Sequence, residues 1–278
     1  MKTVLIDTHC HLHDREFFDL EQAEEMLKRA HKKGIEKIVC IGTSPEDSMT
    51  AHDFAASHNN VYWTYGIHPE YAKEGFEYNF SREFGARQRE NERRSPVATG
   101  RPDAAREKIY SKPPIAIGEV GLDYHYEGYN REAQIKLFEE MLQLAKDNNL
   151  PVSFHVREAF DDFFAVVANF PEVKGVVHSF SDNKKNLKRI LENTDYYIGV
   201  NGMATYSTLP TPPLDRIVLE TDAPFLTPVP FRGIINECGY IREIAEWLAL
   251  KLDVNFDEVE KVTTKNAEKL FDFKCTGI

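Results

Sequence analysis

The chain has 278 residues, of which 42% are hydrophobic and 28% are charged, and its formal net charge is −11. This composition is typical of a globular protein, and the length suits a single α/β barrel. The negative charge excludes a protein that holds nucleic acid through a broad basic surface, although divalent cations can still bind phosphate locally.

Cysteine usage and hydropathy together favour the cytoplasm. No CxxC spacing occurs among the four cysteines, which are Cys10, Cys40, Cys238 and Cys275, so we expect no disulfide framework. No segment approaches the roughly 18 consecutive apolar residues of a membrane-spanning helix. Residues 1–9 (MKTVLIDTH) already contain a carboxylate and a histidine, so we expect no signal peptide.

Short apolar or β-branched runs alternate with amphipathic segments along the chain. The runs predict strands at residues 3–7, 36–42, 61–66, 114–119, 151–155, 175–179, 196–200 and 216–221. Helices are expected between most of them, and two further helices are expected at 238–253 and 255–273. This alternation predicts parallel βα units, either closed into a (β/α)8 barrel or left open as a doubly wound sheet.

Two segments interrupt the alternation. Residues 80–113 are charged and poor in apolar residues. We interpret them as a solvated insertion, rather than a substrate-gripping one, in a single barrel domain that spans residues 1–278. Residues 204–215 lie where a barrel would place its seventh helix, but three prolines there prevent a regular helix.

The stretch DTHCHLHD, residues 7–14, places a histidine at every second position. Alternate residues of an extended segment point to the same side. We therefore expect His9, His11 and His13 to point one way, together with Asp7. Such a concentration of imidazoles indicates a metal site, provided that further ligands come from elsewhere in the chain.

Further candidate ligands end or follow the other predicted strands. These are His68 after the third strand, Glu119 at the fourth, His155 at the fifth, His178 at the sixth and Asp222 after the eighth. The carboxyl ends of parallel strands form the functional edge in either fold, so these side chains converge on one mouth. Imidazoles and carboxylates bind Zn²⁺, Mn²⁺ and related ions, and a carboxylate can bridge two ions for phosphate ester hydrolysis. The alternative is that Glu119 and Asp222 each belong to an ion pair beneath the mouth.

Six motifs occur in order along the chain: DTHCHLHD, GIHPE, IAIGEVGLDY, VSFHVREA, VVHSFSD and IVLETDAPFLTP. Together they resemble the TatD-type metal-dependent deoxyribonucleases of the amidohydrolase-like barrels. The resemblance runs from residue 3 to about residue 272 and leaves residues 80–113 outside. It implies a (β/α)8 TIM barrel with a dinuclear metal site at its C-terminal mouth. It also implies a phosphodiesterase, an exonuclease that cleaves DNA.

The same resemblance implies a set of ligands for two divalent ions, whether Zn, Mn, Mg or Co. His9, His11, Glu119 and Asp222 would hold one ion, and Glu119 would bridge to a second ion held by His155 and His178. A metal-activated water would attack the phosphodiester, with Asp222 as its general base. Glu119 and Asp222 are therefore the expected catalytic residues.

The resemblance also implies residues that contact substrate. His68 would contact the phosphate or orient a ligand. Arg157 could pair with a phosphate oxygen, or with a carboxylate at the start of a helix. Asp123 and Tyr124 are expected to support the site or the fold. His13 lies where the chain already turns away from the strand, so we expect it to be a bystander or to face the substrate.

The chain departs from the family pattern at positions that would line the mouth. Glu70 stands where the family often has histidine, and HSFSD replaces HCFSG. The segment FRGIINECGY keeps Arg232 and Asn236 of an RGxRNxP element but has Ile235 and Cys238 in place of its second arginine and its proline. None of these positions is an implied metal ligand, so the departures concern the choice of substrate.

Two other classes of function stay open. One is an amidohydrolase-type enzyme that acts on an amide, a lactone or a small phosphoester. Such enzymes often bridge their metals with a carboxylated lysine, whereas the matching strand here, PIAIGE, ends in glutamate. The other is a degenerate barrel that binds nucleic acid or a protein, and the full ligand set disfavours it. We expect DNA or another phosphodiester as substrate, no membrane and no obligate protein partner.

Overall fold

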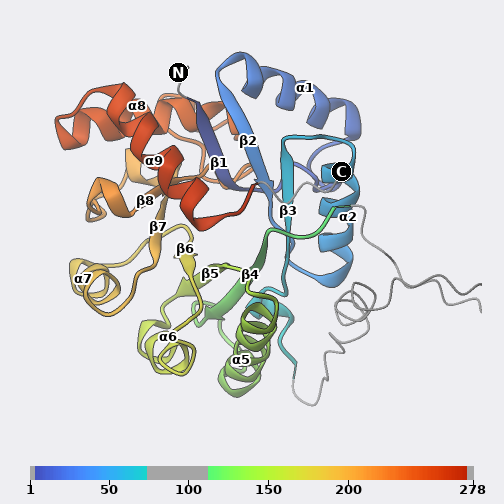
Figure 1. Ribbon diagram of the computed structural model, residues 1–278, viewed down its shortest axis with the longest axis vertical. Coiled ribbons are helices and arrows are strands. Elements are labelled where there is room, and N and C mark those ends of the chain that lie inside the picture. Colours follow the sequence, from blue (N-terminus) through green and yellow to red (C-terminus); the bar gives the residue numbers. More distant parts are fainter. Residues whose placement is uncertain (1–3, 74–111, 274–278) are drawn as a thin grey trace, which may run out of the picture.

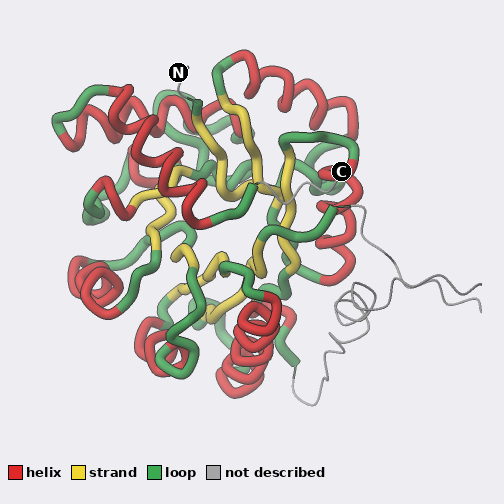
Figure 2. Tube along the Cα trace, in the orientation of Figure 1, coloured by secondary structure: helices red, strands yellow, loops and turns green. Residues whose placement is uncertain are grey.

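The structure is a computed structural model that describes residues 4–73 and 112–273. Eight parallel strands follow one another in chain order within one sheet (Figures 1 and 2). They are β1 (Leu5–Cys10), β2 (Ile35–Cys40), β3 (Val61–Tyr65), β4 (Ala116–Asp123), β5 (Val152–Arg157), β6 (Gly175–Val177), β7 (Tyr197–Val200) and β8 (Ile217–Leu219). Each of them overlaps one of the eight predicted strands.

The sheet closes on itself where β8 returns beside β1. The Thr8 hydroxyl donates to the Leu219 carbonyl at 2.9 Å, and the Asp222 N–H donates to the His9 carbonyl at 2.9 Å. These bonds join the two edges that an open sheet would leave unpaired. The predicted (β/α)8 TIM barrel is confirmed, and the doubly wound alternative is wrong.

Seven helices in the described residues surround the strands (Figure 2). They are α1 (Leu20–Lys32), α2 (Pro45–Ala56), α5 (Arg131–Asn148), α6 (Phe160–Val167), α7 (Lys184–Asn193), α8 (Ile241–Leu252) and α9 (Phe256–Leu270). Side chains that accept backbone N–H groups begin several of them; Asp19 caps α1, for example, and Ser44 caps α2. Within the described ranges, no helix combines the length and the apolar character needed to cross a membrane.

The chain between β7 and β8 contains only two short 3-10 turns, η2 (Gly202–Thr205) and η3 (Leu214–Arg216). The expected absence of a regular helix over 204–215 is therefore confirmed, because proline lacks the N–H that a helix interior needs. After β8, the turn η4 (Cys238–Tyr240) leads into the two predicted closing helices. The insertion predicted at 80–113 lies almost wholly outside the described residues, so that prediction and the single-domain boundary stay predictions.

The hydrophobic core has two parts. One lies between the sheet and the helices, where Phe138 of α5 and Phe163 of α6 pack near Phe154 of β5. The other fills the barrel at its amino end, where Phe271 and Phe273 close the interior after α9. Both parts leave the carboxyl ends of the strands free for polar side chains.

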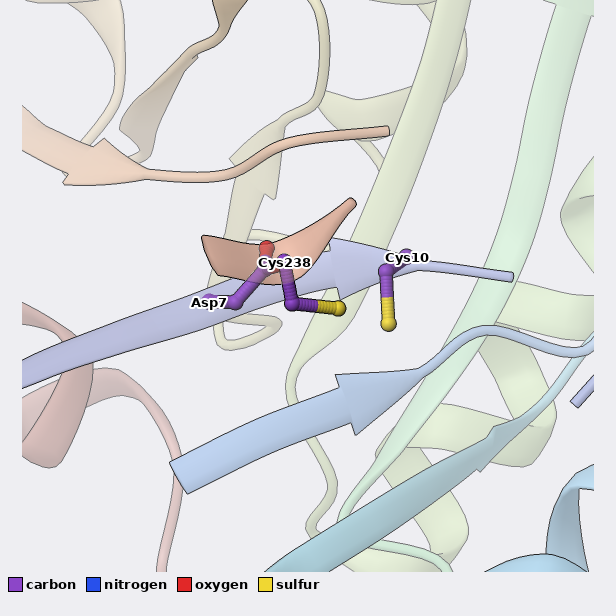
Figure 3. Close-up of side chains that lie close together, drawn as sticks. All are labelled: Asp7, Cys10 and Cys238. Carbon is purple, nitrogen blue, oxygen red and sulfur yellow. The ribbon is translucent and has the colours of Figure 1, made fainter. Parts of the chain in front are cut away.

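Asp7 does not share the side of the histidines, so that expectation is wrong. The pairing of β1 with β2 shifts register between Asp7 and Cys10. Such an irregularity changes the face on which a side chain lies. Asp7 instead lies beside Cys10 and Cys238 (Figure 3). Its carboxylate accepts the Thr221 N–H at 2.9 Å and the Thr221 hydroxyl at 2.6 Å, and thus ties β1 to the segment after β8.

Candidate active site

Six of the predicted site residues converge at the carboxyl ends of the strands. They are His9 and His11 from β1 and the residue after it, Glu119 from β4, His155 from β5, His178 after β6 and Asp222 after β8. All are buried or nearly so. The barrel therefore collects, from five strands, side chains that lie far apart in the sequence.

Glu119 occupies the centre of this group. Its Oε1 lies 2.6 Å from Nδ1 of His155 and 3.8 Å from Nε2 of His178. Its Oε2 lies 3.4 Å from Nε2 of His9. The two oxygens of one carboxylate thus face two different sets of imidazoles. Gly66 lies against this strand, since a Cβ there would come within 2.2 Å of the Gly118 carbonyl carbon.

Asp222 lies on the β1 side of the same group. Its Oδ1 is 3.5 Å from Nε2 of His11, 3.6 Å from Nε2 of His9 and 4.0 Å from Nε2 of His178. The ring of His9 also stacks on that of His178, with centroids 3.5 Å apart. Nε2 of His9 is buried and makes no hydrogen bond, although carboxylate oxygens of Glu119 and Asp222 lie 3.4 Å and 3.6 Å away.

In His9 and His11 the ring nitrogen that faces away from the carboxylates, the outward nitrogen, is Nδ1. In each ring this nitrogen has a partner that holds the ring in place. Nδ1 of His11 donates to the Ile41 carbonyl at 3.1 Å. Nδ1 of His9 lies 3.4 Å from the Ser153 hydroxyl oxygen. These contacts leave Nε2 of each ring facing the two carboxylates. Such bonding to the remote nitrogen fixes the orientation of metal-binding histidines in proteins.

Carboxylates lie beside the remote ring nitrogens of His155 and His178, although the contact to His178 is an ion pair rather than a hydrogen bond. Asp123 accepts Nε2–H of His155 at 2.9 Å, so this acid, which we expected to support the site or the fold, contacts a site histidine directly. Glu220 lies fully buried with Oε1 3.1 Å from Nδ1 of His178, and it also accepts the Ser179 N–H at 2.7 Å. Sequence reasoning missed Glu220. The available signal was its place two residues before Asp222, at the end of the same strand.

The charges of the site stabilise one another strongly. Burial opposes the protonated form of His11, but the Asp222 carboxylate outweighs it and raises the pKa to about 9. Burial likewise opposes protonation of His155 and His178, yet their carboxylate neighbours raise these pKa values to about 9 and about 10. Burial also opposes ionisation of Glu119, but the imidazoles around it, His178 foremost, hold its pKa well below the usual range. Without an added cation, the site is therefore an ion-pair network.

His68 lies beside this group rather than within it. It caps η1 (Pro69–Tyr71), and its ring meets that of His155 edge-on with centroids 4.4 Å apart. Its Nε2 is 3.9 Å from Oε1 of Glu119, and its Nδ1 is 3.5 Å from Glu70. Burial, with the charge of His155, lowers its pKa to about 4, so the ring is neutral at neutral pH.

Arg157 and His13 both lie outside the central group. Nη1 of Arg157 donates to the Tyr126 hydroxyl at 3.3 Å, and no carboxylate of the described residues lies within 4.0 Å of it. His13 is buried and turns toward α2, where its Nε2 lies 3.1 Å from Asp47. Arg157, at the end of β5, thus has no ion-pair partner among the described residues, whereas His13 points away from Glu119.

The chain is similar to a family model and to several known proteins. Residues 6–272 match the family model described as TatD related DNase. The chain is 31% identical over 277 residues to YabD of Bacillus subtilis, named an uncharacterized metal-dependent hydrolase, with 96% of this chain and 99% of YabD covered.

Two further comparisons concern proteins that carry the TatD name. The chain is 31% identical over 263 residues to the 3′-5′ ssDNA/RNA exonuclease TatD of Erwinia amylovora, with 89% of this chain and 93% of that one covered. The crystal structure of YJJV, a TatD homologue from Escherichia coli K12, superposes with a TM-score of 0.76 at 27% identity. That match covers 96% of this chain and 98% of YJJV.

Proposed function

Because the chain belongs to the TatD related DNase family and is a metal-dependent hydrolase, we propose that it hydrolyses phosphodiester bonds at an end of single-stranded DNA. The substrate class comes from the exonuclease relative, whose name specifies single-stranded DNA and RNA. The observation that carries the proposal is the division of the Glu119 carboxylate between His155 on one side and His9 on the other.

The donor set fits two divalent cations. In the proposed arrangement His9, His11, Glu119 and Asp222 would hold one ion, and Glu119, His155 and His178 would hold the other. The buried Nε2 of His9 supports this, because an unpaired buried nitrogen costs about 1–3 kcal/mol and a cation between it and the carboxylates would remove that cost. The partners on the outward nitrogens support it as well, since they already aim the free nitrogens at the acids.

When bound, divalent ions supply Lewis acidity that makes a water nucleophilic at neutral pH and offsets the charge of a phosphodiester. Asp222 then acts as general base: the imidazoles lower its pKa despite burial, so at neutral pH it is ionised and can accept a proton from the attacking water. The water oxygen forms the new bond to phosphorus while the bond from phosphorus to the leaving deoxyribose oxygen breaks.

We assign phosphate binding to two residues beside the proposed ligands. Arg157 has no ion-pair partner among the described residues, and its guanidinium suits a phosphate oxygen. His68 is neutral because of its lowered pKa, so it can donate one N–H without adding charge. Together they would orient the phosphodiester over Glu119.

The test is a substrate panel on the purified chain. End-labelled single-stranded DNA, duplex DNA, RNA, a lactone and an amide are each incubated with Mn²⁺, Mg²⁺, Zn²⁺ or Co²⁺, and with EDTA as control. We expect stepwise shortening of the single-stranded oligonucleotides that EDTA abolishes. Turnover of the lactone or the amide, with the oligonucleotides left intact under every metal, would assign the chain to the wider amidohydrolase group instead.

A further inference from the structure

Exposed apolar side chains gather around the mouth of the barrel. Eleven large hydrophobic side chains are exposed in the described residues, and nine of them lie in segments that follow the carboxyl end of a strand. The two exceptions are Leu20, the first residue of α1, and Leu250 on α8. All six exposed aromatics are among the nine. An apolar concentration at the mouth of a polar site indicates contact with the apolar part of a ligand.

Two of these aromatics form a pair beside the proposed metal ligands. Phe225 and Phe17 meet edge to face with ring centroids 5.2 Å apart, and the Phe225 ring lies 6.3 Å from that of His11. The Phe225 N–H donates to the Asp222 carbonyl at 2.8 Å, which ties the ring to the site. Both rings are nearly half exposed, at 46% and 43%. The pair therefore offers a fixed aromatic surface next to the place where we put the reacting phosphate.

Two arginines without an ion-pair partner in the described ranges accompany the aromatics. Arg157 and Arg232 have no carboxylate within 4.0 Å among residues 4–73 and 112–273, whereas Arg131 at the start of α5 pairs with Asp162. Each lies over a tyrosine, Arg157 at 5.2 Å from the Tyr126 ring centroid and Arg232 at 3.7 Å from that of Tyr206. In a chain with a net charge of −11, two free arginines at the mouth favour a phosphate-bearing ligand over an apolar peptide.

Arg157 lies across the site from the aromatic pair, whereas Arg232 lies on the same side as the pair. Phe225 and Arg232 belong to the segment after β8, next to β1, and Arg157 ends β5 across the barrel (Figure 1). A strand of nucleic acid that crosses the mouth would meet the aromatic pair on one side and Arg157 on the other, with Glu119 between them.

We propose that Phe225, braced by Phe17, stacks one unpaired base at the end of a nucleic acid strand, while Arg157 and Arg232 hold phosphates on the two sides of the site. This inference rests on the proposed function and adds the element that selects single strands, since a base inside a duplex has no free face. Stacking on an aromatic ring is tolerant of base identity, so the end is held without sequence preference.

The experiment measures how much the base contributes to turnover. Three end-labelled oligothymidylates serve as substrates: one complete, one with an abasic tetrahydrofuran unit at the terminal position and one with it at the penultimate position. The readout is kcat/KM for the complete oligonucleotide divided by kcat/KM for each abasic one. The wild-type chain should favour the complete oligonucleotide over one of the abasic ones by about tenfold or more.

The variants separate stacking from general apolar contact. In Phe225→Ala the ratio should approach one, in Phe225→Leu it should stay low, and Phe225→Trp should restore it, because leucine keeps apolar volume but has no π face. Leu250→Ala, which shortens the exposed side chain on α8, is the control and should keep the wild-type ratio. Thermal unfolding confirms that each variant is folded, as expected for exposed positions.

Each contrary outcome has its own meaning. A wild-type ratio near one for both abasic substrates, or an unchanged ratio in Phe225→Ala, would overturn the stacking site while leaving the nuclease proposal intact. A wild-type ratio in Phe225→Leu would show that the base is held by apolar contact that needs no aromatic ring, and would overturn the stacking site. A wild-type chain that cleaves no oligonucleotide with any metal refutes the proposed function itself, and the stacking site with it.

Discussion

Nδ1 of His155 lies 2.6 Å from Oε1 of Glu119, and this ring is reversed relative to the other histidines of the site. His9, His11 and His178 face the carboxylates with Nε2. The reversal follows from Asp123, which takes Nε2 of His155 at 2.9 Å. A carboxylate one strand away thus decides which nitrogen of His155 is available to a cation.

The variant Asp123→Asn tests this dependence. We expect it to weaken metal binding by about 10–100-fold, because the ring loses the charged acceptor that orients it. Isothermal titration of the metal-free protein with Mn²⁺ measures the change. Asp162→Asn is the matched control, since that acid bonds to Tyr124 and Arg131 instead. Equal affinities in Asp123→Asn and the wild type would show that His155 keeps its orientation without the acid.

Glu220 should have the same importance for His178. Glu220→Gln is expected to weaken metal binding by about 10–100-fold. Gly199→Ala gives an independent route to the same defect, because a Cβ there would lie 2.3 Å from Oε2 of Glu220 and would displace the carboxylate. If Gly199→Ala binds metal as the wild type does while remaining folded by circular dichroism, the position of the Glu220 carboxylate does not matter to the site.

Substitutions of the two central acids, Glu119 and Asp222, should cause different defects. Glu119→Gln removes the proposed bridge, so we expect the purified protein to retain fewer ions by elemental analysis and to lose activity. Asp222→Asn should lower kcat by about 10²–10⁴-fold even when excess metal restores occupancy, because the proton acceptor is lost. Glu70→Gln, which alters an exposed acid beside His68, should retain the wild-type metal content. Full metal content in Glu119→Gln would refute the bridge.

His13 and His11 separate structure from metal binding within one motif. His13→Ala should keep its metal ions but lose about 1–3 kcal/mol of stability, because Asp47 then lacks its buried partner. His11→Ala should lose an ion, because it removes a nitrogen that faces Asp222. Metal content is measured after dialysis, and stability is measured by chemical denaturation of the metal-free proteins. Together the two measurements distinguish the two variants. Loss of metal from His13→Ala would place that ring in the site after all.

The sequence predicted that the six central residues lie together, because each stands at or just after the carboxyl end of a strand and parallel strands bring those ends together. The same reasoning included His68, and only the family resemblance separated the six expected metal ligands from it. The side to which Asp7 points was predicted wrongly, because period-two alternation cannot anticipate a register shift between Asp7 and Cys10. Glu220 was not predicted as a site residue, for a different reason. A buried acid acts here on a neighbouring imidazole, and only the folded barrel shows that His178 is that neighbour.

The apolar surface of the mouth was also beyond the reach of pattern reasoning. Phe17 and Phe225 are 208 positions apart in the chain numbering, and each alone looks like an ordinary loop aromatic. They meet only because β8 closes against β1. The barrel fold was predictable from the order of elements, whereas a contact across its closing seam depends on the side-chain directions there.

Metal binding should be coupled to proton release. In the metal-free protein, carboxylates raise the pKa values of His11 and His155 to about 9 and that of His178 to about 10, against the ordinary value near 6.5. At pH 7.5 these rings are protonated, so an ion must displace protons to reach them. We therefore expect affinity for Mn²⁺ to rise with pH and to level off near 10. Titration heats in two buffers of different ionisation enthalpy count the released protons.

The same pKa values set opposite pH dependences for stability with and without metal. For a group whose pKa is raised by folding, the contribution to stability is complete below its unfolded pKa of about 6.5 and is lost as pH rises through its folded pKa of about 9 to 10. With EDTA, the melting temperature should therefore fall between pH 6.5 and 10 relative to a His178→Gln variant, which lacks the most strongly shifted ring. With saturating metal, the ions should contribute more stability as pH rises over the same range, because fewer protons then compete for the nitrogens.

His58→Gln is the control, since that ring pairs with Glu24 outside the site. Parallel pH profiles for the wild type with metal and with EDTA would mean that these imidazoles are not the groups that bind the ions.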